Sequence, residues 1–187
     1  MAAKLDQVVP WGRLRREYEL MFRLTPEDFG RGILDCGGGP ASFNAELHAQ
    51  GHRVVSVDPI YCFSAAQIRS RFEAAGETIL RQVRATPDVW TWTFHRNVDD
   101  LHANRCRALE SFLADYEAGR NDGRYVVGEL PVLPFRDRQF GLALCSHLLF
   151  LYSDLLPEEF HVRSAVELAR VASEIRIFPL LTLQHER

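Results

Sequence analysis

Three consecutive glycines and two aspartates are the residues whose types and spacing could do chemistry in this sequence. Gly37, Gly38 and Gly39 follow a short apolar run that contains Asp35, and Asp58 ends a second apolar run 21 residues after Gly37. A glycine turn tolerates positive φ and leaves no side chain where a ligand approaches. A helix that begins after such a turn points free N–H groups at that ligand. The turn therefore indicates a binding floor, with a tight turn that binds nothing as the alternative.

Asp58 lies where an acid can accept hydrogen bonds from both hydroxyl groups of a ribose. A lone acid at the end of a strand would carry no information, but its pairing with the glycine turn at this spacing indicates a nucleoside. The dinucleotide fingerprint G-x-G-x-x-G fits only in part, because Ser42 stands at its third glycine position. A nucleotide-dependent oxidoreductase is therefore the less favoured class.

Hydrophobic periodicity around these residues predicts an alternating α/β chain. Strands are expected at 33–36, 52–59, 124–130, 140–147 and 174–183, and helices at 11–24, 40–50, 63–76, 101–119 and 157–171, with Thr25 and Pro26 starting a further short helix. The order strand, glycine turn, helix, strand is a βαβ unit, whose strands are parallel and whose connection is right-handed. The 187 residues suit one domain, 1–187, with its N-terminal helices in 11–30.

The second and third expected strands are separated by more chain than one connecting helix needs. We interpret 63–76 as the connecting helix and about 77–122 as a helical insertion, because a structureless loop of that length would be improbable. The stretch 88–100 places Trp90, Trp92 and other aromatic residues beside charges. It would form either a lid over a substrate or a small satellite core under helices.

The stretch ILDCGGGPA (33–41) resembles the first motif of class I S-adenosylmethionine-dependent methyltransferases, which reads apolar–apolar–acid–x–G–x–G–x–G. Ala41 replaces the last glycine of that motif. The stretch VVGELPVLPFRDRQFGLALCSH (126–147) follows the register of this family from its third strand into its fourth, with Glu129 in place of an aspartate. The matches cover about 31–60 and 124–181, and the chain is similar to uncharacterised bacterial members of the superfamily.

The resemblance implies a fold and an activity. The fold is a Rossmann-like, doubly wound and mostly parallel sheet of about five strands in the order 3-2-1-4-5, with helices on both faces. No counterpart of the family's strands 6 and 7 is found, so the chain is expected either to be a shortened version of a longer protein, the favoured alternative, or to pair with a second copy across the open sheet edge. The implied activity is methyl transfer from S-adenosyl-L-methionine to a small molecule. A non-catalytic S-adenosylmethionine- or nucleoside-binding module of the same fold is the alternative.

The resemblance also assigns roles on the cofactor side of the site. Asp35 would orient the ammonium group of the cofactor, directly or through water. Gly37 and Gly39 would let the backbone approach its methionine and ribose portions. Asp58 would hold the ribose hydroxyls, and Pro59 would lie against the adenine. Asp35 could equally be a buried acid that accepts hydrogen bonds from the turn.

Further residues would complete the adenine pocket and the reaction centre. Glu129 would accept a hydrogen bond from the adenine amino group, or else cap a loop, and Leu130 would pack on the ring. Cys145 and His147 would sit near the transferable methyl group. His147 is the candidate base for an acceptor that carries a proton, although it could equally pack on the following helix.

The three residues Tyr61, His95 and Tyr152 are weaker candidates for a base than the histidine after the fourth strand.

Composition limits the binding partners that we expect: a net charge of −3 favours neither nucleic acid nor an acidic membrane. The arginine-rich stretch 13–18 is balanced by acids, and we interpret it as a solvated helix face. The four cysteines form no CxxC pair, which indicates reduced thiols, a cytoplasmic location and no metal site.

Overall fold

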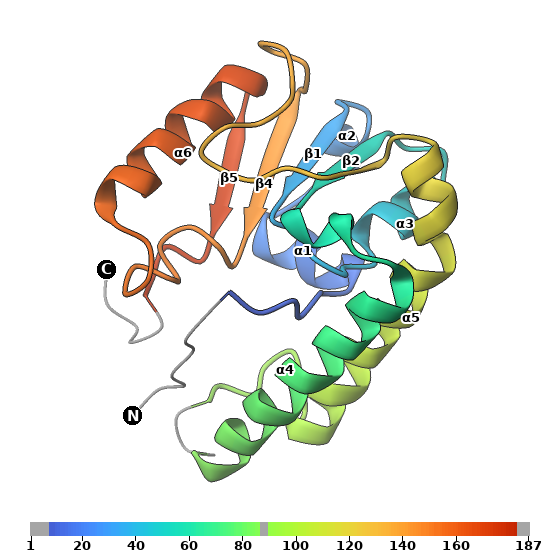
Figure 1. The fold of residues 1–187 in the computed structure, drawn as a ribbon, viewed down its shortest axis with the longest axis vertical. Helices are drawn as coiled ribbons and strands as arrows, with labels where there is room; N and C mark the ends of the chain where they lie inside the picture. Colours follow the sequence, from blue (N-terminus) through green and yellow to red (C-terminus); the bar gives the residue numbers. More distant parts are fainter. Residues whose placement is uncertain (1–7, 87–89, 183–187) are drawn as a thin grey trace.

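A single parallel sheet organises the chain (Figure 1). The structure, a computed structural model, describes residues 8–86 and 90–182. The strands lie in the order β3-β2-β1-β4-β5 and comprise β1 (Ile33–Cys36), β2 (Val54–Val57), β3 (Tyr125–Val126), β4 (Leu142–Ser146) and β5 (Ile175–Phe178). The predicted Rossmann-like α/β class and strand order are confirmed.

Alternating side chains in the strands divide the core into two layers. On one face, Ile33 and Leu142 pack with the helices α1 (Arg15–Met21), α2 (Pro26–Phe29) and α3 (Phe43–His48). On the other face, Leu34 and Ala143 pack with α6 (Glu158–Val171). Helices therefore cover both faces, and the carboxyl ends of β1, β2 and β4 meet at one edge.

The connection from β2 to β3 is a 3-10 turn (Pro59–Cys62) followed by a hairpin of two helices, α4 (Ala65–Ala85) and α5 (Val98–Asn121). The expected end of the first of these helices at residue 76 was wrong, because α4 continues to Ala85. It is α5 that contacts α3 and β3 and leads the chain back to the sheet. The hairpin extends past the carboxyl ends of the strands (Figure 1).

Four strands are shorter than the sequence indicates: β2 and β4 lose one or two residues at each end, and β3 and β5 lose more. The strand expected at 124–130 pairs only at Tyr125–Val126, and the chain then turns back where Val132 N–H donates to Glu129 C=O (3.3 Å). The strand expected at 174–183 ends at Phe178, because Pro179 has no N–H to continue a ladder. Residue 183 lies outside the described residues.

One edge of the sheet is β5, and apolar side chains are exposed beside it. Val162 and Val166 of α6 are 56% and 65% exposed, and Leu180 is 64% exposed. The expected pairing of this edge with a second copy stays a prediction. Within 8–86 and 90–182, none of the helices has the length and apolar character needed to cross a membrane.

Candidate functional site at the carboxyl edge of the sheet

The glycine turn between β1 and α3 has the predicted backbone form. Gly37 and Gly39 take φ values of 69° and 53°, which other residues rarely adopt. A Cβ on Gly39 would have Asp58 Oδ2, at 4.0 Å, as its nearest neighbour, so the space over Gly39 is open. A Cβ on Gly37 would stand 2.9 Å from Leu148 Cδ2. The open part of the floor is therefore at Gly39, while Leu148 covers Gly37.

Asp58 joins the end of β2 to the glycine turn. Gly39 N–H donates to its Oδ2 (2.9 Å) and Ile60 N–H donates to its Oδ1 (2.8 Å). Burial raises the pKa of Asp58 to about 6, against the lowering effect of these two hydrogen bonds, and the nearby charge of Glu129 raises it further. Each carboxylate oxygen still has a lone pair for a ligand hydroxyl.

Asp35 lies beneath the turn. Its carboxylate is 1% exposed and accepts hydrogen bonds from Tyr18 Oη (3.1 Å) and Ser56 Oγ (3.1 Å). A Cβ on Gly38 would stand 2.1 Å from Asp35 Oδ2, so only glycine fits there without a shift. Burial raises the pKa of Asp35 to about 7. Its role toward a cofactor ammonium stays a prediction, because direct contact would require the turn or Tyr18 to move.

The predicted adenine side lies next to Asp58. Pro59 begins the 3-10 turn after β2. Glu129 is exposed and close enough to act on the pKa of Asp58, whereas Leu130 is buried, at 5%. Tyr61, which the sequence offered only as a weak candidate base, is buried and donates from Oη to Gly39 C=O (2.8 Å). It therefore fixes the glycine turn, and its place three residues after Asp58 was the available signal.

The two predicted residues at the end of β4 differ in their surroundings. Cys145 is fully buried in the core, and burial raises the pKa of its thiol to about 12. Its thiol thus packs inside the protein, which leaves only its backbone for a ligand. His147 takes a φ of 53°, and its Nδ1 lies 3.0 Å from Ser146 Oγ. Burial, followed by the charges of Arg13 and Arg105, lowers the pKa of His147, so its ring is neutral.

The N-terminal segment 9–15, here called the strap, crosses the same edge. Its Arg13 C=O accepts from Ser42 N–H (3.1 Å), and its Val9 N–H donates to Tyr152 Oη (3.4 Å). Interpreting 13–18 as a solvated helix face was wrong for part of the stretch: Glu17 and Tyr18 are buried. Arg15 and Arg16 pair with Glu19, at 2.8 and 3.3 Å.

Helix α5 reaches α1, directly after the strap, through a buried ion pair. Arg105 donates from both terminal nitrogens to Glu17 (2.6 and 2.8 Å), and His95 Nε2 lies 3.4 Å from the same carboxylate. Burial would raise the pKa of Glu17. The hydrogen bonds from His95 and Arg105, together with the charges of Arg105 and Arg13, lower this pKa well below its usual range. Part of the expected helical insertion therefore belongs to the site. A lid formed by 88–100 stays a prediction, and residues 88 and 89 lie outside the described residues.

Comparison with known proteins gives one strong likeness. No protein-family model matches the chain. The "Uncharacterized protein MJ0045" of Methanocaldococcus jannaschii is 32% identical over 184 residues, which are 98% of this chain and 82% of that protein. The chain belongs to the MJ0045 family. The name of that relative states no activity, so the function of the MJ0045 family has to be argued from the site.

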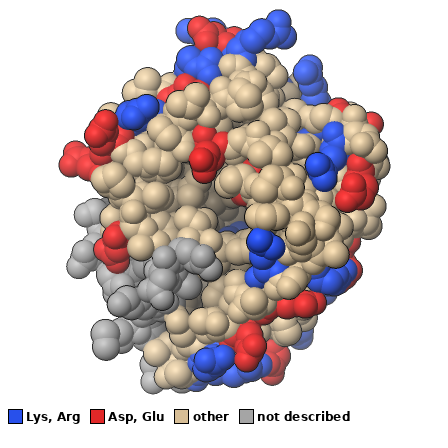
Figure 2. Space-filling view, viewed as in Figure 1, with Lys and Arg blue, Asp and Glu red and all other residues tan. Residues whose placement is uncertain are grey.

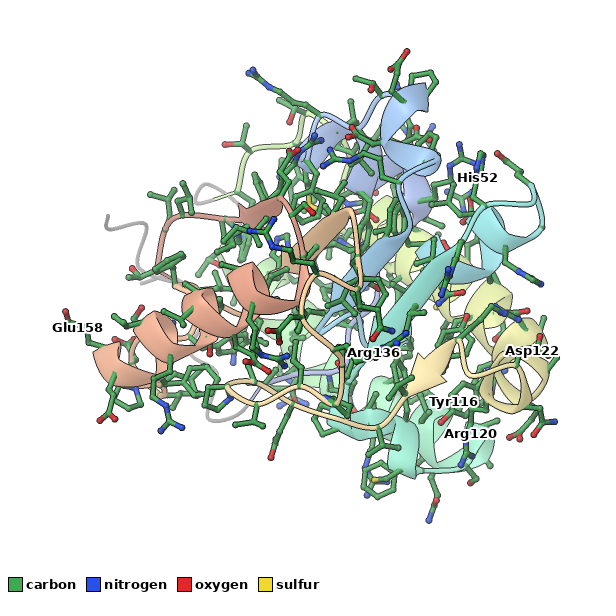
Figure 3. All side chains as sticks on the ribbon, turned by 90° about the horizontal axis from the view of Figure 1, so that it is seen from above. His52, Tyr116, Arg120, Asp122, Arg136 and Glu158 are labelled. Atoms are coloured by element: carbon green, nitrogen blue, oxygen red, sulfur yellow. The ribbon has the colours of Figure 1, made fainter. Side chains whose placement is uncertain are left out.

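This member of the MJ0045 family has a cavity at the opposite edge of the sheet, with a volume of about 500 Å³. It lies at the amino end of β2, and its lining includes His48, His52, Arg53, Asp122 and Arg124. His52 and Asp122 are labelled in Figure 3. None of the predicted site residues lines this cavity.

Proposed function

We propose that this protein is an S-adenosylmethionine-dependent methyltransferase that acts on a small-molecule acceptor. The observation that carries the proposal is the link from Asp58 to Gly39 beneath open space. It joins a carboxylate suited to ribose hydroxyls with a backbone that a ligand can approach closely. The net charge of −3 supports a small molecule over nucleic acid as the acceptor, and we place the protein in the cytoplasm.

The residues present at this edge fit S-adenosylmethionine. Asp58 has acceptor lone pairs left for two hydroxyls, and the missing side chain of Gly39 leaves room beside it. Pro59 directly follows Asp58, and Glu129 is close enough for its charge to act on the pKa of Asp58, so both would be available to the adenine. When bound, the cofactor supplies a methyl group on a positively charged sulfur.

The chain's own contribution would be alignment, exclusion of water and proton handling. His147 is neutral, the protonation state that a base needs. In the tautomer whose Nδ1–H donates to Ser146 Oγ, Nε2 is the atom left to take a proton from the acceptor. Its lowered pKa makes it a weak base, which suits an acceptor whose proton becomes acidic as the new bond forms.

Calorimetry with S-adenosylhomocysteine, S-adenosylmethionine and NAD tests the proposal. We expect the two sulfur nucleosides to bind and NAD not to bind. A screen of small molecules with labelled S-adenosylmethionine should then reveal an acceptor. Binding without transfer to any acceptor would favour the non-catalytic module. The lowered pKa of His147, which makes it a weak base, also supports that alternative. Binding of NAD alone would contradict both functions.

A further inference from the structure

Arg13 differs from the other arginine of the site in making no hydrogen bond or ion pair within the described residues, although the charge of Glu17 acts on its pKa. Arg105 binds Glu17 with both terminal nitrogens, whereas the Arg13 side chain makes no hydrogen bond or ion pair with any residue in 8–86 or 90–182. The Arg13 side chain is partly exposed. Burial and then the charge of Arg105 lower its pKa to about 10. An anion bound to Arg13 would oppose both effects, because an opposite charge favours the charged form of the guanidinium.

The backbone fixes where Arg13 stands. Its C=O accepts from Ser42 N–H, and the preceding Gly12 is pressed against the turn, since a Cβ there would stand 2.1 Å from Pro40 O. At its other end the strap contacts Tyr152. Arg13 thus lies on a segment held at both ends across the carboxyl edge. Viewed as in Figure 1, the surface is hollowed near the ends of the strands, with basic atoms at the margin (Figure 2).

The positive charge of Arg13 is not neutralised by an ion pair with its neighbours among the described residues. Glu17 is occupied by Arg105 and by His95, so the pair Arg105–Glu17 is neutral as a unit. His147 is neutral because burial and the two arginines lower its pKa. One unpaired guanidinium matches a singly charged anion, and its planar fork fits the two oxygens of a carboxylate.

The neighbours of Arg13 place it on the acceptor side. The strap that carries Arg13 donates from Val9 N–H to Tyr152 Oη (3.4 Å), and the charge of Arg13 acts on His147 and on Tyr152, both of which follow β4. The pKa of Asp35, beneath the glycine turn, responds instead to Tyr18, Ser56 and Asp58. We propose that Arg13 binds a carboxylate group of the methyl acceptor, beside His147 and Tyr152. The inference rests on the proposed function, because it assigns the acceptor's charge at that site.

A carboxylate at Arg13 could also come from the methyl donor, so the first experiment separates the two sources. S-adenosylhomocysteine is titrated into the wild type, Arg13→Gln and the control Arg16→Gln, whose side chain is exposed on α1 and pairs with Glu19. We expect equal affinities. A loss of about tenfold or more in Arg13→Gln, with unchanged binding of 5′-methylthioadenosine, which has no carboxylate, would assign Arg13 to the donor and overturn the proposal.

The second experiment tests the acceptor's charge directly. Small aliphatic and aromatic acids, each paired with its primary amide, are titrated into protein saturated with S-adenosylhomocysteine. We expect at least one acid to bind about tenfold or more tightly than its amide. This preference should disappear in Arg13→Gln, return in part in Arg13→Lys and remain in Arg16→Gln. No preference in the wild type, or a preference that persists in Arg13→Gln, overturns the proposal.

Failure of the proposed function gives a different result. If S-adenosylhomocysteine does not bind the wild type, the methyltransferase proposal fails, and the acid and amide pairs are titrated into the ligand-free protein. An acid preference that disappears in Arg13→Gln then still supports a carboxylate site at Arg13, and its persistence overturns one. Thermal unfolding of Arg13→Gln and Arg16→Gln checks that both variants fold.

Discussion

Asp58 has two tasks at the residue scale, because it holds the glycine turn and, in the proposed function, also the ribose. Asp58→Ala removes charge-assisted hydrogen bonds to a ligand, so we expect the affinity for S-adenosylhomocysteine to fall by about 1–3 kcal/mol. Calorimetry measures the loss, with Asp99→Ala as the control, since Asp99 is 80% exposed on α5. Equal affinities of the two variants would remove the ribose assignment.

The raised pKa of Asp58 makes binding depend on pH. Ribose hydroxyls donate to the ionised carboxylate, while the free protein protonates Asp58 below about pH 6. Binding must then release a proton, so affinity should fall as pH decreases through 6, by at most about tenfold per pH unit. Calorimetry from pH 5 to 8 measures this slope. Because the pKa of Asp35 is also raised, to about 7, Asp35 contributes to the same pH dependence. The contribution of Asp58 is the pH dependence of the affinity that is lost in Asp58→Ala.

Local spacing made part of the site predictable from sequence. The positive φ of Gly37 and Gly39 and the position of Asp58 follow from a strand, a turn and the next strand, all within about 25 residues. Arg13 and Glu17 could not be assigned in this way. Their environment depends on Arg105, 88 residues after Glu17, and no local pattern indicates which charges a fold will bury together.

At the element scale, the buried pair Arg105–Glu17 attaches α5 to α1. Arg105→Met removes both charged hydrogen bonds to the buried Glu17 carboxylate and leaves it only the contact with His95, so we expect the free energy of unfolding to fall by about 3–5 kcal/mol. Arg69→Met is the matched control, because Arg69 also makes two hydrogen bonds, to Glu110, but on the exposed surface of the hairpin. Its loss should stay below about 1 kcal/mol.

Urea unfolding at pH 7 measures both losses. Adding Glu17→Gln to Arg105→Met should restore part of the stability, because it removes the uncompensated charge. Similar losses for Arg105→Met and Arg69→Met would show that the buried pair contributes no more than a surface pair. The lowered pKa of Glu17 also sets the pH range of this contribution: it is present above the usual pKa of a glutamate and is lost as pH falls below it.

The elements themselves were predictable where one pattern dominates. β1 was expected at 33–36 and is found there, because a short apolar run is closed by glycines. The length of α4 was not predictable, since Gly76 looked like a helix end but lies inside the helix, where a Cβ would stand 3.4 Å from Trp11 Nε1. A glycine that lies inside a helix looks like a stop signal in the sequence.

At the scale of the whole molecule, ligand binding should stabilise the fold, because the proposed site joins β1, β2, the strap and α5. A ligand that binds only the folded protein contributes about 2.7 kcal/mol at 100 times its Kd. For a domain of this size, 1 kcal/mol corresponds to about 2–4 °C in Tm. We therefore expect S-adenosylhomocysteine at that concentration to raise the Tm by roughly 5–10 °C.

The same measurement separates specific binding from general effects of nucleotides. NAD at equal concentration should leave the Tm unchanged, and Asp58→Ala should need a higher concentration of S-adenosylhomocysteine for the same shift, since its Kd is larger. Arg105→Met is the informative variant here. Its Tm should be lower, but its shift with ligand at 100 times its own Kd should be similar, because the buried pair supports the fold and does not touch the ribose. A shift with NAD as large as that with S-adenosylhomocysteine would mean that the edge binds nucleotides without regard to the sulfur group, and the methyltransferase assignment would fail.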